Sequence, residues 1–304
     1  KVLNQNGYTF EHNLDPDLRK RTGSYYTSID LTLPMAEELI QSLPKDKRKY
    51  IHKLRFLEPC VGTGNFVFAY IFAAAKLIDN SHMKELFENI YVCDINTEAL
   101  SEYRNHLSDL ARNQFGVNLD SDYFASHIGS GLLFDVTQPQ PEYVSLDQVF
   151  PSLTGRRFDI VMTNPPYKNL KAELSHYDSE EEKASDKQKY ASIAKMAKAR
   201  LPLSSFGTLN LYKLFVEEII TKYTRADALV SLLIPTSVLS DKTCEKLREE
   251  IINSHHIVSL KNINENNRFI DAQQALTVVL IDKDDTKKDG LTSICKSYRA
   301  EGET

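Results

Sequence analysis

Three short stretches of the chain combine residue types that could bind a small molecule and act on it. The most specific stretch is Asn164-Pro165-Pro166-Tyr167, which directly follows an apolar run at 158–162. Two consecutive prolines fix the backbone and remove N–H donors. The Asn164 amide oxygen and the Pro165 carbonyl are then left as rigid acceptors for an amino group on a planar substrate, and the Tyr167 ring could stack on its face. The alternative is a structural Pro-Pro turn.

The second stretch is a glycine-bearing loop that follows an acidic residue. An apolar run at 54–57 ends at Glu58, and the loop 59–64 leads into a run at 65–78 that is apolar nearly all round. Glycines let the backbone pass close to a ligand, whose polar groups can then be held by N–H groups of the loop and of the helix N-terminus. A tight turn that binds no ligand is the alternative.

The third feature is Asp94, which ends the next apolar run at 90–93. In nucleotide-binding α/β folds an acidic residue at this place accepts hydrogen bonds from ribose hydroxyls, usually about 20 residues after the glycines. The separation is longer here, which predicts a lengthened first helix or an insertion near 80–89. Asp94 could equally be a favourable charge at a helix N-terminus.

Strand and helix patterns alternate along the chain, as is typical of an α/β fold. The last two predicted strands have no helix-length segment between them, so they suit an antiparallel edge. We therefore predict a Rossmann-like α/β fold with a seven-stranded, mostly parallel sheet, one antiparallel strand and helices on both faces. Predicted strands lie at 54–57, 90–93, 158–162, 229–234, 256–260 and 276–281, and predicted helices at 65–78, 97–115, 209–223 and 242–252.

Composition and charge restrict the class of protein. The 304 residues, 41% hydrophobic and 26% charged, fit one large α/β domain or two small ones. No apolar run reaches the roughly 18 residues that span a membrane, and no signal peptide is visible. We therefore expect a cytoplasmic protein with no membrane partner and, because the chain starts at Lys1, a fragment of a longer one.

The cysteines and charges add few candidate sites. The four cysteines lack C-x-x-C spacing and fit reduced, buried thiols, and no convincing metal-ligand cluster or P-loop lysine motif is present. The net charge is −5. Proteins that bind duplex nucleic acid by themselves are usually basic, so any such affinity must come from a local patch or another domain.

A long polar insertion lies at 168–205. Its first part is acidic, and the stretch 183–200 is basic. A solvated helix is one interpretation, and an arm that contacts phosphates beside the site is the other.

The order of the motifs resembles one enzyme family. Glu-Pro-Cys-x-Gly-x-Gly-Asn-Phe at 58–66, followed by Asn-Pro-Pro-Tyr at 164–167, resembles the N6-adenine DNA methyltransferases. Upstream, Lys-Arg-Thr-Gly-Ser-Tyr-Tyr-Thr at 20–27 is similar to that family's further cofactor motif, and its place before the glycine loop is that of the gamma group. The resemblance covers roughly 19 to 282 and is nearest to the methyltransferase region of single-chain, type IIG-like restriction-modification enzymes.

The resemblance implies a class I S-adenosylmethionine-dependent methyltransferase fold, with S-adenosylmethionine as the cofactor. Thr27 would approach the cofactor's methionine carboxylate, Glu58 its amino group and Asp94 its ribose. Ile95 would lie beside the cofactor adenine, and Ser130 falls where many members contact the adenine amine. The cofactor-binding residues that the resemblance assigns are Tyr26, Thr27, Glu58, Pro59, Cys60, Gly62, Gly64, Asn65, Phe66, Asp94, Ile95, Ser130 and Asn164.

The implied reaction is methyl transfer to the N6 amine of an adenine turned out of the DNA helix. Asn164 and Pro165, with Pro166 fixing the turn, would accept hydrogens from this amine and free its lone pair, so that no strong general base is needed. Tyr167 would stack on the base, and Phe269 falls where the family often places a second aromatic wall. Such stacking recovers about 1–3 kcal/mol per base of the cost of extruding it.

We expect an N-terminal arm at 1–18, a catalytic domain at 19–285, and a tail at 286–304 that leads to an absent target-recognition domain. The partner would be double-stranded DNA, reached through that domain and the basic stretch 183–200. A fused or associated nuclease would complete a restriction-modification system at the nucleoid of a bacterium or archaeon.

Two other functions are compatible with parts of the pattern. Methyltransferases that act on an RNA base amine or a protein glutamine amide also carry Asn-Pro-Pro-Tyr, although they generally lack a motif such as 20–27 before the glycine loop. A cofactor-binding module that has lost catalysis is the non-enzymatic alternative, and the intact 164–167 motif opposes it.

Overall fold

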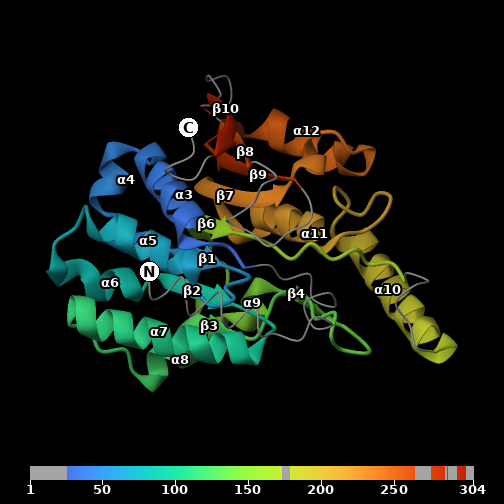
Figure 1. The fold of residues 1–304 in the computed structure, drawn as a ribbon, viewed down its shortest axis with the longest axis horizontal. Coiled ribbons are helices and arrows are strands. Elements are labelled where there is room, and N and C mark those ends of the chain that lie inside the picture. The colour runs from blue at the N-terminus through green and yellow to red at the C-terminus, as the bar shows by residue number, and fades with distance from the viewer. Residues whose placement is uncertain (1–25, 173–178, 264–274, 285, 287–292, 299–304) are drawn as a thin grey trace.

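The strands that end in the chemistry-bearing residues lie side by side in one sheet. The computed structural model describes residues 26–172, 179–263, 275–284, 286 and 293–298. Within them the main sheet has eight strands in the order β10-β8-β9-β7-β6-β1-β2-β3 (Figure 1). Their bounds are β1 Phe56–Glu58, β2 Ile90–Cys93, β3 Ile128–Gly129, β6 Phe158–Thr163, β7 Thr224–Pro235, β8 His256–Ile263, β9 Leu276–Asp282 and β10 Ser293–Tyr298.

The strand directions confirm the predicted α/β fold. The pairs β1–β2, β2–β3, β1–β6 and β6–β7 are parallel. Among the described strands of the main sheet only β9 runs against its neighbours, since it pairs antiparallel with both β7 and β8. The edge strand β10 is parallel to β8 and comes from the segment that the sequence analysis treats as a tail. A separate hairpin joins β4 (Leu133–Phe134) to β5 (Tyr143–Val144).

Helices cover both faces of the sheet, with α3 and α5 together on one side and α11 and α12 on the other (Figure 1). Within the described residues no helix is both long and apolar enough to cross a membrane. The longer helices are α3 Ile29–Ser42, α5 Asn65–Ala75, α7 Thr97–Phe115, α10 Glu180–Arg200, α11 Leu211–Glu218 and α12 Glu245–Ser254. The shorter ones are α4 Lys45–Lys49, α6 Met83–Phe87, α8 Ser121–His127 and α9 Leu146–Val149, with single turns η1 Ile51–Lys53, η2 Asn80–His82, η3 Pro151–Leu153, η4 Ile219–Tyr223, η5 Thr236–Leu239 and η6 Lys242–Cys244.

Local capping explains where several helices begin and end. The α7 helix has the predicted bounds because Asn96 accepts hydrogen bonds from two N–H groups of its first turn and Gly116 closes it in the left-handed conformation. The helix predicted at 209–223 begins later, since the Asn210 side chain caps α11, and its last part is the π-helical turn η4. That turn leads directly into β7, which begins at Thr224, earlier than predicted.

The sheet order places three candidate site residues together. Glu58 ends β1, Asp94 follows β2 and Asn164 follows β6, and these strands are neighbours in the order β6-β1-β2. Because parallel strands present their carboxyl ends at one edge, the three side chains share that edge. The apolar helix α5 begins there as well, and it is buried on nearly every side between the sheet and α3.

Gly64 is a position where only glycine fits. Its φ is +103°, and a Cβ there would lie 2.6 Å from the Tyr103 ring and 2.8 Å from the Phe68 ring. Gly116 also has a positive φ, +67°, but a Cβ there would meet nothing within 4 Å.

We predict that Gly64→Ala lowers the free energy of unfolding more than Gly116→Ala does. The left-handed backbone costs each variant about 1–2 kcal/mol, and the buried clash adds about 1–3 kcal/mol at Gly64 only. Urea denaturation of both variants measures the difference. Equal losses would contradict the clash at Gly64.

Candidate functional site

A cleft opens at the carboxyl ends of β1, β2 and β6. It encloses about 800 Å³ of free space, part of it open to solvent. Most of the residues predicted from the sequence to bind a cofactor line it, and they come from segments far apart in the chain. They are Tyr26, Thr27, Pro59, Cys60, Gly62, Gly64, Asn65, Phe66, Asp94, Ile95 and Asn164. Pro166 also contributes to the lining.

Glu58 lies buried at the base of the glycine loop. Its side chain has 0% exposure, and one carboxylate oxygen, Oε1, accepts a hydrogen bond from the Cys60 N–H at 3.1 Å. The other oxygen, Oε2, has no hydrogen-bond partner among the described residues, and neither has the buried Thr163 hydroxyl. Buried polar atoms are almost always paired, so this pair of atoms marks a place where a ligand's donor group would be stabilised.

Burial raises the pKa of Glu58 well above its ordinary value, and the neighbouring Asp94 carboxylate raises it further. The hydrogen bond from the Cys60 N–H and the nearby Thr163 hydroxyl act in the opposite direction and only reduce the shift. A cationic group placed beside Glu58 would offset both causes of the rise. The site therefore favours a ligand with a positively charged amine.

Asp94 ties the glycine loop to the second strand. Its Oδ2 accepts a hydrogen bond from the Gly62 N–H at 2.8 Å, and its Oδ1 accepts one from the Asn96 N–H at 2.8 Å. Burial raises the pKa of Asp94, while these backbone donors lower it. A carboxylate offers about four lone-pair positions. The Ile95 backbone N–H also acts on this carboxylate, so at least one position is left to accept a hydrogen bond from a hydroxyl group of a ligand.

Hydrogen bonds join the three motifs across the cleft. The Asn164 Nδ2 donates to the Thr27 hydroxyl at 3.0 Å, and the Asn65 Nδ2 donates to the Thr27 carbonyl at 2.7 Å. The Tyr167 hydroxyl donates to the Asn164 Oδ1. These contacts fix the orientation of the Asn164 amide, whose oxygen keeps a second lone pair for another donor.

The Tyr167 ring does not lie where a base in the cleft could stack on it. Its ring is only 8% exposed, packs edge-on against Tyr212 and is not part of the cleft lining. Its hydroxyl lies 2.9 Å from the Leu233 carbonyl as well as beside Asn164. These polar partners within the core hold the ring away from the open part of the cleft.

Ser130 is exposed and is absent from the cleft lining, where Gly131 and Leu132 appear instead. The cause is a close backbone approach. Gly131 has a φ of +123°, and a Cβ there would lie 2.6 Å from the Ile95 side chain. Gly131 thus packs against Ile95 at the cleft, whereas Ser130, expected at the contact with the adenine amine, lies outside the lining. Phe269 lies outside the described residues.

Several lining residues were not assigned to the site from the sequence. Leu211 and Phe215 lie within the helix predicted at 209–223, and Phe134 belongs to no motif. Their spacing signals burial, and nothing in it distinguishes a core contact from a cleft wall. The unassigned lining residues are Val61, Thr63, Gly131, Leu132, Phe134, Leu211 and Phe215.

The chain is similar to a known sequence family and to solved structures. The family described as Eco57I restriction-modification methylase matches residues 88–269, more than half of the chain. No curated protein matches the sequence.

The solved structures share the fold at low identity. A cryo-electron microscopy structure of a DrdV–DNA complex is 15% identical over 97% of this chain and 30% of its own, with a TM-score of 0.67. The type ISP restriction-modification enzyme LlaGI was solved as a nuclease-deletion mutant with a DNA substrate mimic. It is 13% identical over 90% of this chain and 24% of its own, with a TM-score of 0.59. A type I restriction-modification methyltransferase subunit from Streptococcus thermophilus is 14% identical over 91% of this chain and 48% of its own, with a TM-score of 0.52. The chain thus spans less than half of each of these proteins and has the class I S-adenosylmethionine-dependent methyltransferase fold.

We predict that Glu58→Gln stabilises the protein without ligand, and increasingly so as the pH rises. A carboxyl whose pKa is raised by folding contributes stability at low pH and loses it as the pH rises through the folded value. Glutamine keeps the acceptor for Cys60 and cannot ionise. The free energy of unfolding of the variant should exceed that of the native protein by an amount that grows above pH 5 by up to about 1.4 kcal/mol per pH unit.

Urea denaturation at pH 5, 6.5 and 8 measures this difference. The matched control is Glu249→Gln, at an exposed position of α12, for which the advantage should not change with pH. A difference at Glu58 that stays constant with pH would show that its carboxylate is not disfavoured by burial.

Proposed function

Because the chain belongs to the Eco57I restriction-modification methylase family, we propose that it is an S-adenosylmethionine-dependent DNA methyltransferase that methylates the N6 amine of adenine. The enzyme methylates DNA in the cytoplasm as part of a restriction-modification system. One observation carries the proposal: Asp94 and Asn164 line the same cleft, and the buried Glu58 directly precedes its lining residues Pro59 and Cys60, so a cationic ligand and a base amine can be held next to each other.

The cleft fits the cofactor. The unpartnered Glu58 Oε2 would accept a hydrogen bond from the amino group of the methionine part, and Asp94 would accept hydrogen bonds from the ribose hydroxyls. Ile95 and Leu132 supply apolar contacts for the adenine ring. When bound, the cofactor supplies an electrophilic methyl group on a sulfonium.

Asn164 positions the target amine. Its Nδ2 is engaged by Thr27, so the amide oxygen is the atom presented to a donor. Together with the Pro165 carbonyl, it would accept the two N6 hydrogens and draw the nitrogen toward a tetrahedral geometry. Preorganised acceptors of this kind need no reorientation during the reaction, and this makes them effective. Tyr167 would stack on the adenine after its ring leaves the contact with Tyr212.

The ionisable groups of the cleft favour an amine of the base as the acceptor of the methyl group. Methylation of a carbon atom of the base would need a thiolate nucleophile. Cys60 lines the cleft, but burial raises the pKa of its thiol well above the ordinary value, with Glu58 and Asp94 adding to the rise. The thiolate is the reactive form of cysteine. Cys60 therefore stays protonated and serves as a packing residue.

The basic half of α10 is suited to contact DNA phosphates. The helix reaches outward from the body of the fold (Figure 1). It is anchored to the β4–β5 hairpin, whose Phe134 lines the cleft, because the Lys189 ammonium donates to the Val136 carbonyl at 3.1 Å and Arg200 lies 4.5 Å from the centre of the Tyr143 ring. Three exposed lysines, Lys187, Lys195 and Lys198, follow one face of the helix at intervals of eight and three residues. The overall charge of −5 offers little general attraction for DNA, so this face supplies a local one, and sequence-specific recognition requires a further domain.

The reaction is tested by methyl transfer from labelled S-adenosylmethionine to duplex DNA, using the full-length enzyme and Asn164→Ala. We predict label on adenine N6 and a rate about 10²- to 10³-fold lower in the variant, since one preorganised acceptor is lost. Cofactor affinity, measured by calorimetry, should fall by no more than about tenfold, the effect of one hydrogen bond. Label on RNA or on protein glutamine instead of DNA would refute the proposed substrate.

The role of α10 is tested by changing Lys187, Lys195 and Lys198 together to glutamine. Each phosphate contact contributes about 0.9 to the slope of log K against log salt, so we predict that the slope becomes shallower by about 2–3. The control changes three exposed lysines near the amino ends of the strands, Lys45, Lys49 and Lys53, and should leave the slope as it is. Equal effects of the two triple variants would mean that α10 does not contact DNA.

A further inference from the structure

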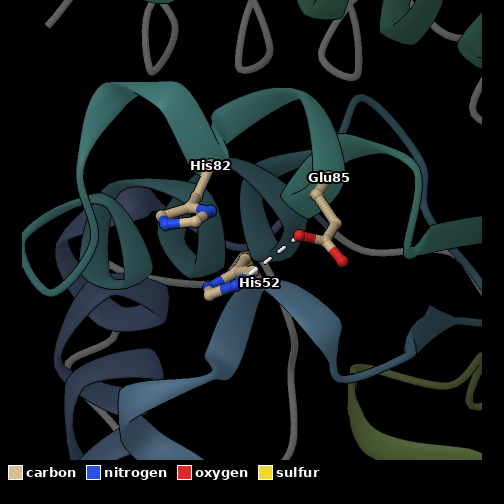
Figure 2. Close-up of side chains that lie close together, drawn as sticks. All are labelled: His52, His82 and Glu85. Carbon is tan, nitrogen blue, oxygen red and sulfur yellow. Dashed lines mark ion pairs between the residues drawn. The ribbon is translucent and has the colours of Figure 1, made fainter.

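His52, His82 and Glu85 form a cluster away from the cleft. Each side chain offers one ligand atom, and these atoms all lie within 4.8 Å of one another. Figure 2 shows the His82 ring above the His52 ring, with the Glu85 carboxylate directed toward His52 from the neighbouring helix. Imidazole nitrogen and carboxylate oxygen together are typical ligands of a divalent transition-metal ion.

The backbone holds two of these residues in place. His52 lies in the turn η1 and Glu85 in α6, and the Asn89 Nδ2 donates to both the His52 carbonyl and the Glu85 carbonyl at 3.0 Å. His82 ends the turn η2 immediately before α6. One amide side chain thus clamps the two backbone segments from which the cluster is built.

His52 is a buried ring without ordinary hydrogen bonds. It is 3% exposed, its Nδ1 has no hydrogen-bond partner among the described residues, and its Nε2 lies 3.6 Å from the Glu85 Oε2, beyond hydrogen-bond range. Buried imidazoles are normally fixed by such bonds. Its ring stacks on the His82 ring at 4.2 Å between centroids and 16° between planes, and the Tyr50 ring packs edge-on against it.

Rotation of the His82 ring out of its stack on His52, together with a shift of the Glu85 carboxylate, would bring the three ligand atoms to metal-binding distances. Ligands 2.0–2.1 Å from a tetrahedral Zn²⁺ lie about 3.4 Å from one another. His82 is exposed and Glu85 partly exposed, so these two side chains can rotate while the buried His52 stays in place. The exposed side of the cluster gives an ion access from solvent and leaves a position for a water ligand.

We propose that His52, His82 and Glu85 bind one Zn²⁺ ion, or a divalent transition-metal ion of similar preference. The site is structural. It lies at the amino ends of the strands, because His52 precedes β1 and Glu85 precedes β2, whereas the cofactor cleft opens at their carboxyl ends. A bound ion fastens η1 to α6 and so stabilises the two connections that lead to the strands carrying Glu58 and Asp94. In the sequence, 29 residues separate His52 from His82, and only His82 and Glu85 are close to each other. The sequence therefore shows no metal-binding pattern.

The test is calorimetric titration of the full-length protein with ZnCl₂, together with thermal unfolding. In the titration we expect His82→Ala to bind one zinc ion fewer than the native protein. In thermal unfolding, the Tm of the native protein should rise by about 4 °C when free zinc is a hundredfold above Kd. MgCl₂, which prefers oxygen ligands, should not raise Tm. Cofactor binding, measured separately, should be the same with and without zinc, so the outcome is independent of the proposed methyl transfer.

His106→Ala is the matched control, because His106 lies 3.8 Å from Glu102 in a similar pair that no second histidine joins within the described part of the chain. This variant should keep the full zinc stoichiometry and the rise in Tm. Two results would overturn the proposal: His82→Ala binding as much zinc as the native protein, or the native protein showing no saturable binding.

Discussion

The hydrogen bond from the Asn164 amide to the Thr27 hydroxyl is the contact on which the site depends. It joins residues 137 positions apart, and Thr27 is in turn bonded to Asn65 at the start of α5. These three segments can meet only if β6 lies next to β1, which the parallel pairing of those strands provides. The arrangement of the sheet thereby fixes which atom of the Asn164 amide is offered to a substrate.

Burial of two carboxylates at the same edge gives the cleft its electrostatic character. Glu58 and Asp94 come from adjacent strands, and burial raises the pKa of both. The backbone donors of Gly62 and Asn96 stabilise Asp94, whereas Glu58 keeps an oxygen without a partner among the described residues. The unliganded protein thus holds a polar group in an unfavourable environment that a cationic ligand relieves. Binding energy for such a ligand is built into the fold before the ligand arrives.

Much of the fold could be predicted because it rests on periodic burial and on local capping. The bounds of α7 follow from an apolar stripe with Asn96 and Gly116 at its ends, and the positions of Glu58, Asp94 and Asn164 follow from apolar runs that stop at a polar residue. The antiparallel β9 was predictable because no helix fits before it.

The remaining features depend on contacts between distant segments. Whether Tyr167 faces a cleft or the core is decided by Asn164, Leu233 and Tyr212, and its motif does not encode those partners. The place of Gly131 beside Ile95 is likewise a matter of close packing between two loops. Residues such as Phe215 look the same in the sequence whether they line a cleft or fill a core.

We propose that this cleft holds S-adenosylmethionine beside Glu58, Asp94 and Asn164. A crystal structure of the protein with S-adenosylhomocysteine, which keeps the amino group and the ribose, tests it most directly. We expect the amino group within hydrogen-bond distance of the Glu58 Oε2 and the ribose hydroxyls within hydrogen-bond distance of Asp94. A bound molecule that leaves the Glu58 Oε2 without a partner, or that lies outside the cleft, would contradict it.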